Sequence, residues 1–152
     1  MSRDDEVMKY FPKLLNIEDS KNFITRMQLH FEAYGFCYFA VDILDTDEFI
    51  GFTGMLHQNY ESHFTPCVDI GWRLKKESWG NGYATEAAMA CIEFVSDRLD
   101  IKEIYSIASL VNANSITVMK KIRMNYHSEF QHPAVLNNEI LRDCVVYSKK
   151  IK

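Results

Sequence analysis

Two glycines close together, directly before an alanine-rich segment, form the most informative chemical pattern in this chain. Gly80 and Gly82 allow backbone conformations that a side chain would forbid, and they leave room for a ligand. The apolar residues that follow have helical spacing, namely Ala84, Ala87, Ala88, Cys91, Ile92, Val95 and Leu99. The first turn of such a helix has unpaired N–H groups and the positive end of the helix dipole. This pattern therefore predicts a phosphate-binding site.

The residues that the loop lacks argue against two common kinds of phosphate-binding loop. It is not a P-loop, because no Gly-Lys-Ser/Thr follows. It nearly matches G-x-G-x-x-G, but Thr85 stands where the third glycine belongs. A dinucleotide loop also needs an acidic residue on a second strand about 20 residues further on. Asp97 and Asp100 lie instead within, or at the end of, the predicted helix.

The residues around these glycines resemble a known cofactor loop. Ile70–Leu74 followed by Trp79–Ala87 is similar to the acetyl-CoA loop of the GNAT superfamily of N-acetyltransferases, in the branch that includes the ribosomal-protein N-terminal acetyltransferases. Further on, Asn112–Ser115 followed by Val118–Lys121 resembles the second cofactor motif of that branch. The two motifs come in the family's order and at its separation.

This resemblance implies an acetyl-CoA-dependent N-acetyltransferase. The acetyl group would pass directly to the primary amine of a protein N-terminus or a small molecule. The cofactor-binding residues that it implies are Ile70, Gly71, Trp72, Arg73, Leu74, Trp79, Gly80, Asn81, Gly82, Tyr83, Ala84, Thr85, Asn112 and Ser115. Two alternatives stay open, which are a GNAT-derived module that binds CoA without transferring acetyl groups and a different nucleotide-binding enzyme.

Family resemblance also implies roles within this set. The backbone edge of the strand Ile70–Leu74 would bind the pantetheine arm, as an added strand would. Asn112 would bond the arm, and Ser115 would donate a hydrogen bond to the departing thiolate. A thiol with a pKa of about 8.5 needs only such modest help. Taken alone, Asn112 would most often be a turn residue and Ser115 a helix cap.

The base that accepts the amine's proton has several candidates. Asp69 comes first, because this branch commonly has a glutamate at its position, and His63 comes second. Glu61 and His57 are alternatives, and each candidate could equally be an exposed loop charge or a hydrogen-bonded histidine. Cys67 could carry an acyl group, but nothing nearby in the sequence activates it. No metal is expected, because no residues have metal-ligand spacing.

Composition limits the remaining possibilities. The 152 residues predict a single domain, 1–152, and 47% hydrophobic with 25% charged residues is typical of a globular protein. A net charge of −4 offers no basic field for nucleic acid. The apolar runs are too short to cross a membrane, and the N-terminus does not resemble a signal peptide. Four widely spaced cysteines suit a reduced, cytoplasmic protein in which they pack as small hydrophobes.

The elements that must position these residues alternate between helices and strands, which predicts an α/β fold. Helices are expected over 4–11, over 17–33 (capped by Asp19 or Ser20 and closed by Gly35), over 84–99, and after Asn114 or Ser115. Strands are expected over 36–43, 49–56, 68–74, 104–111, 124–130 and 143–149. Gly51 and Gly54 predict a bulge or a close backbone approach.

The resemblance implies a GNAT fold, which is a mixed, mostly antiparallel sheet with helices on both faces and a splayed central parallel strand pair. The family's first strand has no counterpart in this sequence, which would leave a sheet edge for a second copy to cover in a homodimer. Arg123 replaces a family glycine, so a different helix ending is expected. The aromatics that could line the acceptor pocket are Phe11, Phe31, Tyr34, Tyr60 and Phe64.

Overall fold

Six strands form one mixed sheet in the order β1-β2-β3-β4-β6-β5 in the computed structural model, which describes residues 1–151. The strands are β1 (Tyr38–Ile43), β2 (Glu48–Gln58), β3 (Cys67–Leu74), β4 (Glu103–Ser109), β5 (Asn125–Gln131) and β6 (Asp143–Lys150). The α-helices are α1 (Ile17–Tyr34), α2 (Tyr83–Arg98), α3 (Ala113–Lys121) and α4 (Glu139–Arg142), with short 3₁₀ turns η1 (Lys76–Ser78) and η2 (Pro133–Val135).

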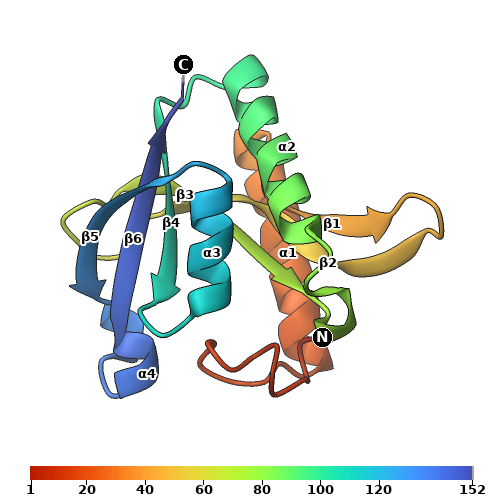
Figure 1. Ribbon diagram of the computed structural model, residues 1–152, viewed down its shortest axis with the longest axis horizontal. Helices are drawn as coiled ribbons and strands as arrows, with labels where there is room; N and C mark the ends of the chain where they lie inside the picture. Colours follow the sequence, from red (N-terminus) through yellow and green to blue (C-terminus); the bar gives the residue numbers. More distant parts are fainter. Residues whose placement is uncertain (152) are drawn as a thin grey trace.

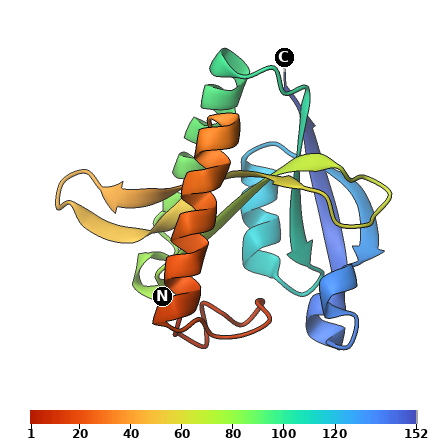
Figure 2. The same cartoon turned by 180° about the vertical axis from the view of Figure 1, so that it is seen from behind.

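Helices cover both faces of this sheet. Helices α2 and α3 lie on one face, and α1 lies on the other (Figures 1 and 2). Strands β3 and β4 are the parallel pair, and the other neighbouring strands pair antiparallel. The predicted α/β architecture with a central parallel pair is therefore confirmed. No helix within residues 1–151 has the length and apolar character needed to cross a membrane.

The main hydrophobic core lies between the sheet and the α2–α3 face. Ile70 and Ile104, from the two parallel strands, are almost completely buried against Val95 of α2 and Met119 of α3. Helix α1 is packed less tightly, because Met27 is its one buried residue within the described chain. Several apolar residues of α1, such as Phe31, remain about half exposed. The α2–α3 layer thus supplies the rigid support for β3 and β4.

At the start of α1 and of α3, the side chain that caps the helix is not the predicted one. Asn16, and not Asp19 or Ser20, caps α1, in a capping box with Asp19. Gly35 ends α1 in the left-handed conformation with φ 77°, as predicted. Asn112 caps α3 by accepting a hydrogen bond from the Ser115 N–H, so the cap lies two or three residues earlier than the expected Asn114 or Ser115.

Two further expectations were wrong. Residues 4–11 form turns and no helix, although Val7 and Met8 are buried as their apolar spacing suggested. A segment of eight residues ended by a proline gains too few hydrogen bonds to offset helix nucleation.

Arg123 adopts the left-handed conformation (φ 62°) despite its side chain. A Schellman-type bond from the Met124 N–H to the Met119 carbonyl (3.0 Å) offsets that strain.

Two glycines in β2 allow the close strand contacts that their sequence position predicted. A Cβ at Gly54 would lie 2.0 Å from the Cys37 carbonyl oxygen, and one at Gly51 would lie 2.2 Å from the Arg73 carbonyl oxygen. Their φ angles of 155° and 152° also favour glycine. A register shift of β1 beside Gly51 gives the predicted bulge.

We predict that Gly54→Ala destabilises the protein more than Gly35→Ala does. Both substitutions force alanine into a positive-φ conformation, but nothing lies within 4 Å of a Cβ at Gly35. The extra cost at Gly54 is that of overpacking, about 1–3 kcal/mol. Urea unfolding of the two variants measures this difference, and equal free energies of unfolding would contradict it.

Candidate active site

The site lies where the two parallel strands separate. Strands β3 and β4 are paired at one position, Asp69 with Tyr105. Just beyond it, the Ser106 hydroxyl donates a 3.0 Å hydrogen bond to the Ile70 carbonyl. After this bond the strands diverge, and a cavity of about 740 Å³ opens between them. Residues from β3, the loop before α2, the start of α3 and the N-terminal segment line it.

The phosphate-binding loop predicted from the sequence opens onto this cavity. Gly80 and Gly82 have φ angles of 79° and 86°, which a side chain would strain. Gly82 is also the N-cap of α2 and offers no side-chain cap, so the first-turn N–H groups of Tyr83 to Thr85 stay free for a ligand. The loop is braced, since Asn81 donates to the Ser78 carbonyl at 3.3 Å.

The edge of β3 provides the second element of a cofactor site. Beyond Asp69, β3 has no strand partner on its β4 side within residues 1–151. The Ile70 and Leu74 carbonyls accept hydrogen bonds from Ser106 and from the Trp79 ring N–H (3.1 Å). By strand alternation the Trp72 backbone faces the same side, and no strand of the described chain pairs with it there. An amide-bearing arm fits this edge as an added strand would.

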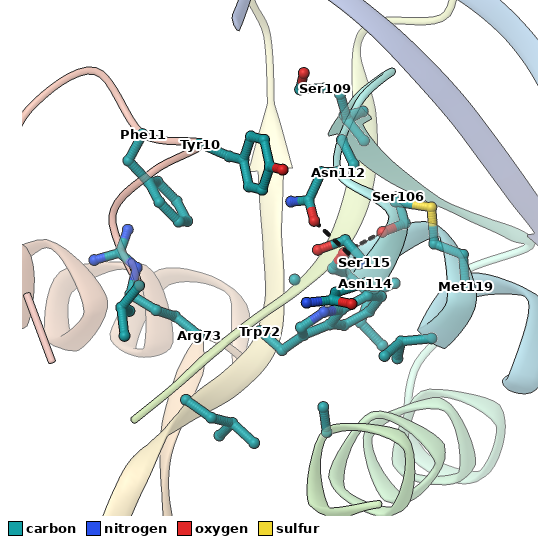
Figure 3. A pocket seen from close by; sticks show the side chains of 18 of the residues that line it. Tyr10, Phe11, Trp72, Arg73, Ser106, Ser109, Asn112, Asn114, Ser115 and Met119 are labelled. Carbon is teal, nitrogen blue, oxygen red and sulfur yellow. Dashed lines mark hydrogen bonds between the residues drawn. The ribbon is translucent and has the colours of Figure 1, made fainter. Parts of the chain in front are cut away.

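The start of α3 closes the far side of the cavity. Asn112 and Ser115 both line it, and the Asn112 side-chain oxygen accepts from the Ser115 N–H at 3.2 Å. This capping bond uses the oxygen and leaves the Asn112 amide N–H₂ and the Ser115 hydroxyl free to contact a ligand. Figure 3 shows Tyr10 between Phe11 and Asn112, and the Tyr10 hydroxyl donates to the Val111 carbonyl at 3.1 Å.

Asp69 is a buried carboxyl that lines the same cavity. Its Oδ2 accepts a 3.0 Å hydrogen bond from the Gln58 amide, while Oδ1 has no partner in residues 1–151. Burial raises the pKa of this carboxyl from 3.8 to about 7, against the smaller opposing effects of the Gln58 amide, the Leu56 backbone N–H and the Tyr38 hydroxyl. A carboxyl that is about half ionised at neutral pH is well matched to accept a proton from an amine.

The other candidate bases lie outside the cavity. His63 is exposed and shares a 2.8 Å hydrogen bond with Ser128 of β5. His57 packs against Tyr34 and His30, and Glu61 is exposed. The structure therefore gives no support to His63 as the base. The sequence could not show whether the loop that carries His63 reaches the cavity.

The structure also shows which of the cysteines and predicted acceptor aromatics could take part in the site. All four cysteines are free, and burial raises the pKa of the Cys67 thiol to about 12, which argues against an acyl-carrying nucleophile. Among the aromatics, Phe11 and Tyr60 line the cavity, whereas Phe31, Tyr34 and Phe64 do not.

Sequence reasoning missed several residues that line the cavity. Gln58, Tyr38 and Tyr10 carried no motif and were brought in by the fold. The side chain of Arg73 was also missed, because the motif assigned only its backbone. Alternation along β3 was the available signal, since it puts Arg73 on the same face as Asp69.

A splayed parallel pair, a free helix N-terminus and an unpaired strand edge together suit a ligand that carries phosphates and an amide-bearing arm. A sequence model described as the acetyltransferase (GNAT) domain matches residues 1–125. The chain belongs to the GNAT acetyltransferase family and is an acetyl-CoA-dependent acetyltransferase. The residues present fit that cofactor, since free loop N–H groups and the β3 edge open onto one cavity.

Individual relatives agree with this family. The chain is 29% identical over 123 residues to the uncharacterized protein YkkB of Bacillus subtilis, covering 81% of this chain and 70% of that one. It is 29% identical over 137 residues to the uncharacterized N-acetyltransferase YnaD of the same organism, covering 90% and 76%. An acetyltransferase structure from Bacillus anthracis superimposes with a TM-score of 0.79 at 25% identity, covering 98% and 84%.

The raised pKa of Asp69 predicts a pH-dependent cost to stability. Between pH 3.8 and about 7 the folded protein keeps a proton that the unfolded chain releases, so the free energy of unfolding falls as pH rises through this range. Asp69→Asn removes that loss. Relative to the wild type, its free energy of unfolding should rise by about 2 kcal/mol from pH 5 to pH 8.

Urea unfolding at the two pH values measures this change. Asp97→Asn, on the exposed surface of α2, controls for the loss of one negative charge. A difference between Asp69→Asn and the wild type that stays constant with pH would mean that Asp69 holds no extra proton in the folded state.

Proposed function

We propose that this chain acetylates a primary amine by direct transfer, with Asp69 as the proton acceptor. One observation carries the proposal, which is that a buried carboxyl with a pKa near 7 lies in the same cavity as the phosphate-binding loop. The motif residues Trp79–Ala87 and Asn112–Ser115 support placement in the branch of the ribosomal-protein N-terminal acetyltransferases. The acceptor is then a protein N-terminus or a small amine, in a cytoplasmic protein whose residues 1–152 form one domain.

Each group of site residues has its own role in the acetyl transfer. When bound, acetyl-CoA supplies the acetyl thioester, and the amine nitrogen bonds to its carbonyl carbon while the carbon–sulfur bond breaks. Asp69, directly or through water, takes a proton from the ammonium group so that the nitrogen has a free electron pair. After attack the nitrogen carries one proton more than the amide product, and this proton goes to the CoA sulfur. Ser115 donates a hydrogen bond to that sulfur as the thiolate departs. The Gly80–Thr85 backbone binds the phosphates, and the β3 edge with Asn112 holds the arm.

A thiol-release assay tests the reaction. With acetyl-CoA and a panel of small amines and N-terminal peptides, the protein should release free thiol only when an amine is present. Mass spectrometry should then find the acetylated amine. If calorimetry detects CoA binding but no amine on the panel causes thiol release, the chain is instead a CoA-binding module without transferase activity.

Asp69→Asn tests the base assignment. This variant should lower kcat/KM for the amine by about a hundredfold or more, the range of general base catalysis. The wild-type kcat/KM should rise with pH and level off above about 7, as Asp69 ionises, and the variant should lose that step. Its acetyl-CoA affinity, measured by calorimetry, should change little. A collapse of that affinity with a normal residual rate would contradict the assignment.

A further inference from the structure

Strand β3 presents two different faces to the molecule. Ile70 and Leu74 are buried, and Trp72 packs against the core beneath α2 and α3. Alternation places Asp69 and Arg73 on the opposite face, toward α1 and the N-terminal segment. Figure 3 shows Arg73 beside Phe11, with Trp72 directed elsewhere. The Arg73 side chain therefore belongs to the half of the cavity that also holds the proposed base.

Two aromatic rings hold the Arg73 guanidinium. Its central carbon lies 3.8 Å from the centre of the Phe11 ring and 5.1 Å from that of Phe52. Phe52 is also the residue paired with Arg73 across β2 and β3. Rings interact with the flat face of a guanidinium and leave the N–H groups at its edge free to bind. Burial lowers the pKa of Arg73 to about 10, so the group stays charged at neutral pH.

This half-buried cation has no opposite charge paired with it among the described residues. None of the four ion pairs found within residues 1–151 involves Arg73, and no hydrogen bond in that part of the chain uses its side chain. Its Nε is one of three buried side-chain polar atoms left without a partner there, together with Asp69 Oδ1 and the Tyr60 hydroxyl. All three residues line the same cavity.

Buried charges are normally paired, and a free guanidinium edge matches the two oxygens of a carboxylate or phosphate. Arg142, which lies nearer the surface, does have such a partner, with a 2.8 Å bond to Asp143. We propose that Arg73 binds an anionic group of the acceptor, so that the acceptor amine also carries a carboxylate or a phosphate. This inference rests on the proposed amine acetylation and adds the substrate class.

The positions of the two groups also set the shape of that acceptor. Asp69 and Arg73 are four residues apart on one strand, or about 13 Å between their Cα atoms. The amine must approach Asp69 while the anion reaches Arg73. The acceptor is therefore an extended molecule with its amine and its anion separated by several bonds.

Matched pairs of amines test the proposal. Each pair consists of an anionic amine and its uncharged counterpart, such as 6-aminohexanoate with its amide, a short peptide with its C-terminal amide, and an amino-alkyl phosphate with its alcohol. Among the amines that are acetylated, the anionic member should have a kcat/KM about tenfold or more higher. Arg73→Gln should remove this preference, and Arg73→Lys should keep part of it. Equal use of both members, or a preference for polyamines such as spermidine, would overturn the proposal.

A binding measurement separates this proposal from the function itself. With CoA at saturation, so that the phosphate loop is filled, inorganic phosphate should raise the melting temperature of the wild type but not that of Arg73→Gln. Absence of that shift in the wild type overturns the inference even if amines are acetylated, whereas absence of turnover alone overturns the proposed function. If Arg73→Gln, with wild-type folding, mainly raises the KM for acetyl-CoA, then Arg73 binds a cofactor phosphate and the proposal is wrong.

Discussion

The structure depends on the point where β3 and β4 stop being neighbours. A parallel pair normally continues its ladder, but here Asp69–Tyr105 is followed by the Ser106 side-chain bond to Ile70 and then by separation. Backbone groups at the exposed edge need hydrogen-bond partners. An amide-bearing cofactor arm satisfies that need, and the gap between the strands gives the reacting groups a common cavity. The core beneath α2 and α3 packs against both strands on one face.

The two faces of β3 then have different chemistry. The Trp72 face continues the hydrophobic core and positions the cofactor loop through the bond from Trp79 to Leu74. The opposite face carries polar groups whose hydrogen bonds are incomplete, Asp69 and Arg73 among them. Burying such groups unpaired costs stability, and this cost is tolerated most often where a ligand completes the bonds. The concentration of these atoms in one cavity is what distinguishes this side of the cavity from ordinary core.

The N-terminal segment contributes to the site although it forms no regular element. Val7 and Met8 anchor it by burial, the Tyr10 hydroxyl ties it to the loop before α3, and Phe11 stacks on Arg73. A helix over these residues would have had a fixed apolar stripe, whereas turns let consecutive side chains reach different partners. The segment thereby joins the Arg73 side of the cavity to the α3 end.

Local patterns in the sequence determined most of the elements and the cofactor loop. Glycines with positive φ, helical spacing after Ala84 and alternation along β3 depend only on neighbouring residues, and they predicted the loop, α2 and the central strands correctly. Caps such as Asn16 and the left-handed Arg123 were missed, because competing local choices differ by little free energy. Only the tertiary structure decided which polar residues share the cavity. It placed His63 outside the cavity, buried Asp69 and left Arg73 unpaired among the described residues, because burial and charge pairing depend on residues far apart in the chain.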